Sequence, residues 1–189
     1  MKLRLPHTNT AFLSNLSTLG WKGSYNMEKD TVVVVESHSI VTLSDYLMEH
    51  KRLTYESVEQ MILHLGNQMI VLSEVGIGML FFNLNSISVL DDTYFLISDL
   101  TNGVPLNSKE QLSLTYPLKM TGLLSPELKN ISTLPVVVSI TSGYYSLALL
   151  CIECLGIDNS LDSIMNTKMY FFLQRCLHKD PHKRYFLYL

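Results

Sequence analysis

The chain has 189 residues, of which 47% are hydrophobic, and a formal net charge of −3 at pH 7. This charge, without any run of lysine or arginine, argues against a nucleic-acid-binding protein. The three cysteines form no disulfide framework and indicate free thiols in a reducing compartment. An intracellular, cytoplasmic protein is therefore expected, or a virion-associated one if the source is viral.

The first half of the chain shows clear local signals only after residue 30. The start, MKLRLPHTNT, lacks the apolar run of a secretory signal. Residues 31–36, TVVVVE, form a β-branched run typical of a buried strand. Thr42 and Asp45 match a capping box that opens a short helix over residues 43–50. Thr54 opens a longer amphipathic helix to about Val75, which Gly76 ends.

The middle of the chain predicts a hairpin, a long loop and one apolar helix. Residues 86–90 and 94–98 form two short strands around the turn at residues 91–92. Residues 100–123 have turn residues and no periodicity, which predicts a loop. Residues 131–152 contain no charge, but Pro135, Gly143 and the run PVVVSIT favour an extended segment before a buried helix at residues 142–155. No membrane span is therefore expected.

A final helix is predicted over residues 162–178, with one apolar face, and it ends before Asp180 and Pro181. The sequence shows no internal repeat, low-complexity tract or linker. It therefore predicts a single domain over residues 1–189.

Two motifs and the order of elements carry a family resemblance. Ser125, Pro126 and Glu127 stand where protein kinases have Ala-Pro-Glu, and residues 176–184, CLHKDPHKR, are close to the family's CL-x-x-DP-x-x-R. With the strand, helix and hairpin order, residues 7–189 resemble the C-terminal lobe of a protein kinase. The resemblance implies a mainly α (α+β) fold. Residues 1–36 would be a remnant N-lobe strand or hairpin with the hinge. Residues 37–189 would be a helical C-lobe with a small catalytic-loop hairpin.

The catalytic positions implied by this resemblance are degenerate. Kinases have the catalytic loop H-R-D-L-x-x-x-N. Met79 stands for its His, Leu80 for its Arg and Phe81 for its catalytic Asp. Asn83 replaces the usual Lys two positions later, and Ser86 replaces the metal-binding Asn. Phosphoryl transfer needs a base, metal ligands and positive charge on the phosphates, so the resemblance implies no catalysis.

Nucleotide and metal binding are expected to be absent as well. Asp99 is the one metal-site residue of the family that is retained, and a lone carboxylate holds Mg²⁺ poorly. The alternative is that Asp99 caps the turn after the hairpin. No Gly-rich phosphate loop or V-A-I-K lysine is found, so we expect no cofactor.

The structural residues of the family are retained. The resemblance implies that Glu127 and Arg184 form a buried ion pair, with Pro126 and Asp180 in the same two motifs. Gly143 stands where kinases have the Asp that holds the catalytic loop, and we expect that this anchor has no loop to hold. Cys151 and Cys154 are interpreted as core thiols, and His178 and His182 as surface residues, so no metal site is expected.

The sequence therefore predicts an inactive kinase-like domain, a pseudokinase, that serves as a protein-interaction or structural scaffold. A protein partner would bind the apolar face at residues 32–38 and 89–96 that an N-lobe normally covers, unless the first 30 residues cover it. A second candidate is the C-terminal edge from Tyr185 to Leu189. The alternatives are a phosphotransferase whose N-lobe comes from another chain or is missing from the gene prediction, and a structural subunit of a larger, perhaps viral, assembly.

Overall fold

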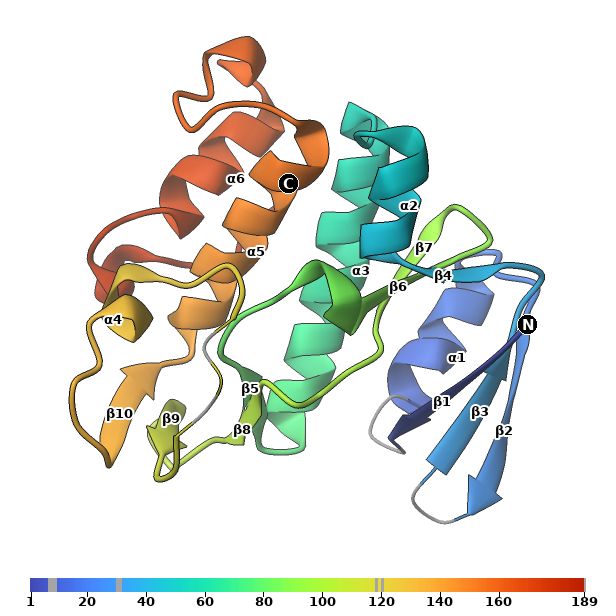
Figure 1. The fold of residues 1–189 in the computed structure, drawn as a ribbon, viewed down its shortest axis with the longest axis horizontal. Coiled ribbons are helices and arrows are strands. Elements are labelled where there is room, and N and C mark those ends of the chain that lie inside the picture. Colours follow the sequence, from blue (N-terminus) through green and yellow to red (C-terminus); the bar gives the residue numbers. More distant parts are fainter. Residues whose placement is uncertain (7–9, 30–31, 118, 120, 189) are drawn as a thin grey trace.

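The computed structural model describes residues 1–6, 10–29, 32–117, 119 and 121–188, which form three apolar clusters (Figure 1). Their strands are β1 (Lys2–Pro6), β2 (Ser24–Lys29), β3 (Val32–Glu36), β4 (Ile40–Thr42), β5 (Ile77–Met79), β6 (Ile87–Leu90), β7 (Tyr94–Ile97), β8 (Gly103–Pro105), β9 (Gln111–Leu114) and β10 (Val136–Ser139). Their helices are α1 (Thr10–Thr18), α2 (Leu43–His50), α3 (Tyr55–Glu74), α4 (Pro126–Lys129), α5 (Thr141–Leu155) and α6 (Lys168–Cys176), with short 3-10 helices η2 (Leu84–Ser86), η3 (Asp162–Ile164) and η4 (Pro181–Lys183).

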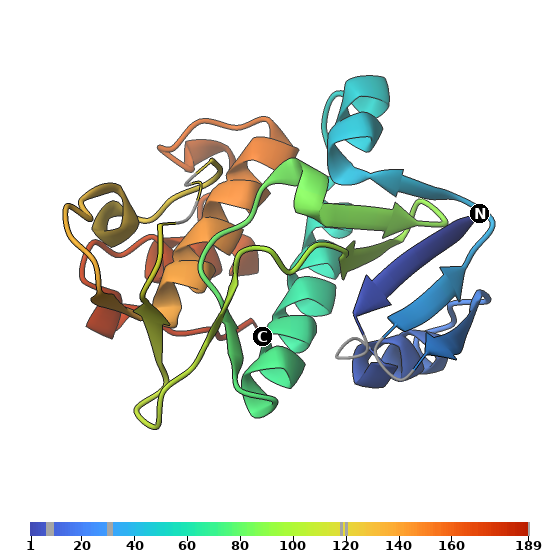
Figure 2. The same ribbon diagram turned by 60° about the horizontal axis from the view of Figure 1, so that its bottom comes forward.

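The N-terminal part is a three-stranded antiparallel sheet in the order β1-β3-β2, with α1 beside it (Figure 2). The predicted strand at residues 31–36 is confirmed as β3, although Thr31 lies outside the described residues. Its valines alternate: Val33 and Val35 are fully buried, and their neighbours are half-buried. Because successive strand side chains point to opposite faces, one face of β3 meets the buried apolar residues of α1.

The expected mainly α fold, with only a remnant strand or hairpin at residues 1–36, is wrong. The structure is mixed α/β, 40% helical and 23% strand, with its strands in small antiparallel sheets. The N-terminal sheet escaped prediction because β1 and β2 lie at its two edges. Strand β1 has one buried side chain, Leu5, and β2 has the polar sequence SYNMEK.

Helices α2 and α3 begin at the predicted N-caps, Thr42 and Thr54, but in α2 the Asp45 carboxylate bonds to the Thr42 hydroxyl and does not complete the predicted capping box. Thr42 Oγ1 accepts a hydrogen bond from the backbone N–H of Asp45 at 3.1 Å and donates to the Asp45 carboxylate at 2.7 Å. Thr54 Oγ1 likewise accepts from the backbone N–H of Ser57 at 3.1 Å. Side-chain oxygens at this position satisfy amides that the first helical turn leaves free. Gly76 follows α3 with a positive φ of 77°.

Helix α3 packs against the sheet β4-β6-β7 and bonds to the edge strand β7. The backbone N–H of Phe95 donates to Nδ1 of His64 at 3.3 Å. Gln68, one turn later, accepts from the N–H of Ile97 at 2.8 Å and donates to its carbonyl at 3.3 Å. Both helix side chains are buried. They therefore bond to backbone groups on the edge of β7 that faces away from β6.

Residues 100–123 are not one long loop, and this expectation needs correction. Strand β8 pairs with β5, and β9 pairs with β10. Both strands are three or four residues long, and their partners lie more than about 20 residues away in the chain. A local pattern therefore gave no signal for them.

The predicted helix over residues 162–178 is also wrong at its start. Residues 162–164 form the separate turn η3, and α6 begins only at Lys168. Asn166 has a φ of 64°, which a helix cannot continue through. Thr167 caps α6 by accepting from the N–H of Tyr170 at 3.1 Å.

Helix α5 is the buried central helix that the uncharged stretch predicted, and β10 lies in the predicted extended segment before it (Figure 1). Most of its side chains belong to the largest apolar cluster. Cys151, Cys154 and Cys176 are buried free thiols. Among the described residues, no helix is long and apolar enough to cross a membrane.

The connection from the N-terminal sheet to the rest of the chain is held by Asp91. The hydroxyl of Ser37 and the backbone N–H of Ser39 donate to its two carboxylate oxygens at 2.6 and 3.0 Å. The indole N–H of Trp21 donates to the Ser37 hydroxyl at 2.9 Å. Burial opposes ionisation here, but the hydrogen bonds from Ser37 and the nearby backbone lower the pKa of Asp91.

Substitution Asp91→Asn is expected to lower the free energy of unfolding by about 1–2 kcal/mol, because charge-assisted hydrogen bonds are lost. Asparagine tolerates the positive φ of 49° at this position. The adjacent Asp92→Asn is the matched control, since Asp92 is exposed and also has a positive φ. The midpoint of urea unfolding should fall for Asp91→Asn and stay unchanged for Asp92→Asn. Equal shifts of the two midpoints would contradict the role of Asp91.

Candidate functional site

The segment after β5 contains the positions at which the resemblance places the catalytic loop. Met79 is 1% exposed, and Leu80, Phe81 and Phe82 are fully buried. Leu80 and Phe81 belong to a cluster formed with residues of β8, β9, α4 and β10. A phenyl ring in this apolar surrounding neither accepts nor orients a proton. The segment therefore contributes packing.

This segment is anchored to α5, which corrects the expectation that the anchor has no loop to hold. The backbone N–H of Phe82 donates to the hydroxyl of Ser146 at 2.7 Å. Gly143 lies so close that a Cβ there would be 2.5 Å from the Met79 carbonyl oxygen. A glycine that allows close approach and a serine that accepts one backbone bond therefore hold the segment.

Substitution Gly143→Ala is expected to destabilise the fold by about 1–3 kcal/mol, because the added methyl group overlaps the Met79 backbone. At an ordinary helix position the same change would stabilise by up to about 1 kcal/mol. Glu153→Ala, at an exposed position of α5, is the control for helix propensity. Thermal unfolding of the two variants checks the prediction, and a Gly143→Ala protein as stable as the native one would contradict the close contact.

Asn83 and Ser86 bond to each other. The side-chain carbonyl of Asn83 accepts a hydrogen bond from the backbone N–H of Ser86 at 2.8 Å. The hydroxyl of Ser86 accepts one from the backbone N–H of Asn83 at 3.3 Å. This reciprocal pair is a capping box around η2. Neither side chain is therefore directed at a shared ligand with Asp99.

Asp99 caps the turn after β7, as one of the two alternatives predicted. Its Oδ1 accepts from the backbone N–H of Thr101 at 2.8 Å and from the hydroxyl of the same residue. Asp99 itself is exposed. Among the described residues no group of three or more His, Cys, Asp or Glu side chains could hold a metal ion.

Glu127 and Arg184 form the ion pair that the resemblance implied. The guanidinium donates to both carboxylate oxygens of Glu127, at 2.5 and 3.0 Å. The Arg184 side chain is fully buried and that of Glu127 is 22% exposed. Arg184 also donates to the carbonyls of His178 and Lys179 and lies 4.7 Å over the ring of Tyr145.

The surroundings of this pair keep it charged. Burial opposes ionisation of Glu127, but hydrogen bonds from Arg184 and Ser142 lower the pKa of its carboxyl group. Pro126 occupies the first turn of α4, and the Asp180 side chain accepts from the N–H of His182 at 3.0 Å at the start of η4. The Glu127–Arg184 pair thus ties α4 to the end of η4, while Pro126 and Asp180 stand at the starts of the two helices.

The remaining nucleophile and metal candidates are structural. Burial raises the pKa of Cys176 to about 12 and raises the pKa of Cys151 and Cys154 as well. Such thiols stay protonated and unreactive at neutral pH. His182 is exposed, and His178 bonds to the backbone of Asp180 next to it.

The two expected docking surfaces have different outcomes. The face at residues 32–38 and 89–96 is covered by the chain's own N-terminal residues, because Leu90 and Leu96 share a cluster with α1 and Trp21. In the C-terminal segment, Phe186 and Tyr188 pack edge-on against Phe172 at ring distances of 5.4 Å. The side chains of Tyr185 and Leu187 point outward and are 52% and 40% exposed. Leu189 lies outside the described residues.

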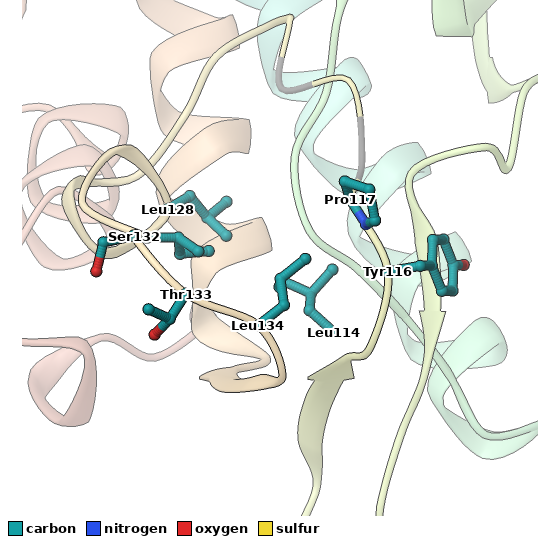
Figure 3. A pocket seen from close by; sticks show the side chains of 8 residues that line it. Leu114, Tyr116, Pro117, Leu128, Ser132, Thr133 and Leu134 are labelled. Carbon is teal, nitrogen blue, oxygen red and sulfur yellow. The ribbon is translucent and has the colours of Figure 1, made fainter.

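A cavity of about 350 Å³ opens where the β9–β10 ribbon splays apart (Figure 3). Leu114 and Leu134 point toward each other across it, with Leu128 on one side and Pro117 on the other. None of the described residues that line it carries a charge. The cavity can therefore hold an apolar group, and its described lining contains no carboxylate, imidazole, amine or thiol.

No protein-family model matches the sequence, and no curated protein matches it either. The function must therefore be inferred from the residues themselves.

Ser146 is the residue of this region that the sequence interpretation missed. It lies in an apolar helix, and its partner is a backbone amide 64 residues earlier. The one available signal was the combination of Gly143 with a serine on the next helical turn of a charge-free stretch. Small residues on one helix face indicate close approach of another backbone.

Proposed function

We propose that this chain is a catalytically inactive, kinase-like protein that acts as a protein-interaction scaffold. The observation that carries the proposal is the state of Phe81. The resemblance assigns it the position of the catalytic Asp, and its side chain is fully buried in an apolar cluster. No rotation of a phenyl side chain supplies the missing base.

The polar positions around Phe81 support the same conclusion. Asn83 and Ser86 satisfy each other, and Asp99 bonds to Thr101. Phosphoryl transfer depends on metal ions and cationic groups that neutralise the phosphates. The residues at the implied site supply one carboxylate and no cation.

The ion pair between Glu127 and Arg184 supports a role that depends on the folded structure and not on catalysis. Glu127 and Arg184 keep the bidentate contact, and the α5 anchor keeps the segment after β5 in place. Residues that preserve architecture are therefore present where residues that would catalyse are absent. This combination is what a binding scaffold requires.

The test combines thermal unfolding with a phosphotransfer assay, each in the presence and absence of Mg·ATP. The proposal predicts no nucleotide-dependent rise in melting temperature and no phosphate transfer to a generic protein substrate. Asp99→Asn is the matched variant, because it removes the one carboxylate of the implied metal site. A stabilisation by Mg·ATP that disappears in this variant would overturn the proposal, and so would any turnover.

A further inference from the structure

Strand β10 has an open edge at the end of the molecule opposite the N-terminal sheet (Figure 1). Of the described strands, β9 is the one that pairs with it, in a two-stranded sheet. Its sequence is VVVS, and residues 131–140 contain no charged side chain. Open edges of this kind present backbone donors and acceptors to any other extended chain.

The direction of the backbone identifies which groups are free. The N–H of Gln111 donates to the Asn107 side chain at 3.0 Å, and its carbonyl accepts from the Asn107 N–H at 2.9 Å. Gln111, which lies opposite Ser139, therefore points away from β10. Alternate residues of a strand bond to opposite sides. The pairs that bond across the ribbon are therefore Leu112 with Val138 and Leu114 with Val136.

It follows that Val137 and Ser139 direct their backbone N–H and carbonyl groups to the open edge. No backbone hydrogen bond joins either of them to a described residue outside the β9–β10 ribbon. The side chain of Val137 is 55% exposed. Two donors and two acceptors are thus available in one row.

A groove of about 440 Å³ runs beside this edge. Its walls come from the turn at residues 109–111, from Glu127 and Ile131 at α4, and from Pro181 and His182 at η4. The volume is within the range of sites that enclose a ligand. Because residues of α4 and η4 line the groove together with β10, the space favours a single extended chain over a second folded protein.

The charges of the groove select an uncharged occupant. Lys109 and Glu110 are adjacent and of opposite sign, and Glu127 is neutralised by Arg184. The groove therefore carries no net charge that would favour an acidic or basic peptide.

We propose that β10 binds an uncharged, extended segment of a protein partner, which adds to the Val137–Ser139 edge as a further strand. The backbone of the segment supplies the hydrogen bonds, and its alternate apolar residues cover Val137. This inference rests on the proposed scaffold function and gives it a docking surface.

The test uses fluorescence anisotropy with a labelled, end-blocked peptide of alternating threonine and valine and the whole chain. Val137→Pro removes the outward N–H without touching a bond to β9, so binding should weaken about tenfold. Val137→Thr keeps the N–H and the branched side chain, and should bind within about twofold of the native chain. Circular dichroism of both variants checks that they fold.

A second probe keeps the test independent of the variants. The same peptide with an N-methyl group on every backbone nitrogen cannot donate from either edge, and should not bind the native chain. Absence of binding by the unmodified peptide, or equal binding of the methylated one, would overturn the docking surface and leave the Mg·ATP result unaffected. Sedimentation that shows self-association lost in Val137→Pro would also overturn it, because the edge would then bind a second copy.

Discussion

Substitution Glu127→Ala is expected to lower the free energy of unfolding by about 3–5 kcal/mol. The change leaves the guanidinium of Arg184 buried without its counter-ion, and removing one partner of a buried pair typically has a cost of this size. Arg184 is fully buried and cannot reach water without moving η4. Urea unfolding monitored by circular dichroism measures the loss.

The controls separate the ion pair from the loss of a side chain. Lys129→Ala changes an exposed residue of the same helix and should shift stability by no more than about 0.5 kcal/mol. The double variant Glu127→Leu with Arg184→Met removes both charges, and should be less destabilised than the sum of the two single variants by at least about 2 kcal/mol. Additive losses would mean that the contact contributes nothing as a pair.

Helices α2 and α3 could be predicted because their signals are local. Thr42 and Thr54 cap them through residues three positions later, and Gly76 follows α3 directly. The hairpin β6–β7 is similar, since Asp91 and Asp92 take positive φ angles between two apolar runs. In each case the residues that determine the element are neighbours in the chain.

The elements that were missed depend on distant partners. Strand β8 is three residues long and exists because β5 pairs with it, and β9 requires β10. Strands β1 and β2 flank the strongly patterned β3 but carry weak patterns themselves. The mainly α expectation failed because it counted only elements with local signals.

The sequence was enough to predict which residue types occupy the candidate site. It was not enough to predict which residues contact one another there. Phe81, Leu80 and Met79 are apolar in the sequence, so the absence of a base there needed no structure. The bond from Phe82 to Ser146 joins segments whose proximity only the fold creates. The same holds for the open edge at Val137, whose direction depends on how Asn107 bonds to Gln111.

The stability of the protein is expected to fall by about 2 kcal/mol between pH 7 and pH 5 because of His64. Burial lowers the pKa of this imidazole from 6.5 to about 4, and its neutral Nδ1 accepts the Phe95 N–H. The unfolded chain binds a proton near pH 6.5 while the folded chain does not. The contribution is therefore complete above pH 6.5 and is lost as the pH falls toward 4, about 3 kcal/mol in total.

The pH window assigns this loss to one residue. The lowered pKa values of Glu127 and Asp91 affect stability only at more acidic pH, because their unfolded values already lie near 4. In His64→Asn, the amide oxygen can replace Nδ1 as acceptor but does not titrate, so the difference in unfolding free energy between pH 7 and pH 5 should shrink by about 2 kcal/mol. Leu63→Asn, at the adjacent exposed position of α3, changes no titratable group and should keep the native pH dependence. If His64→Asn and the native chain lose stability equally over this range, the buried ring does not control the pH dependence.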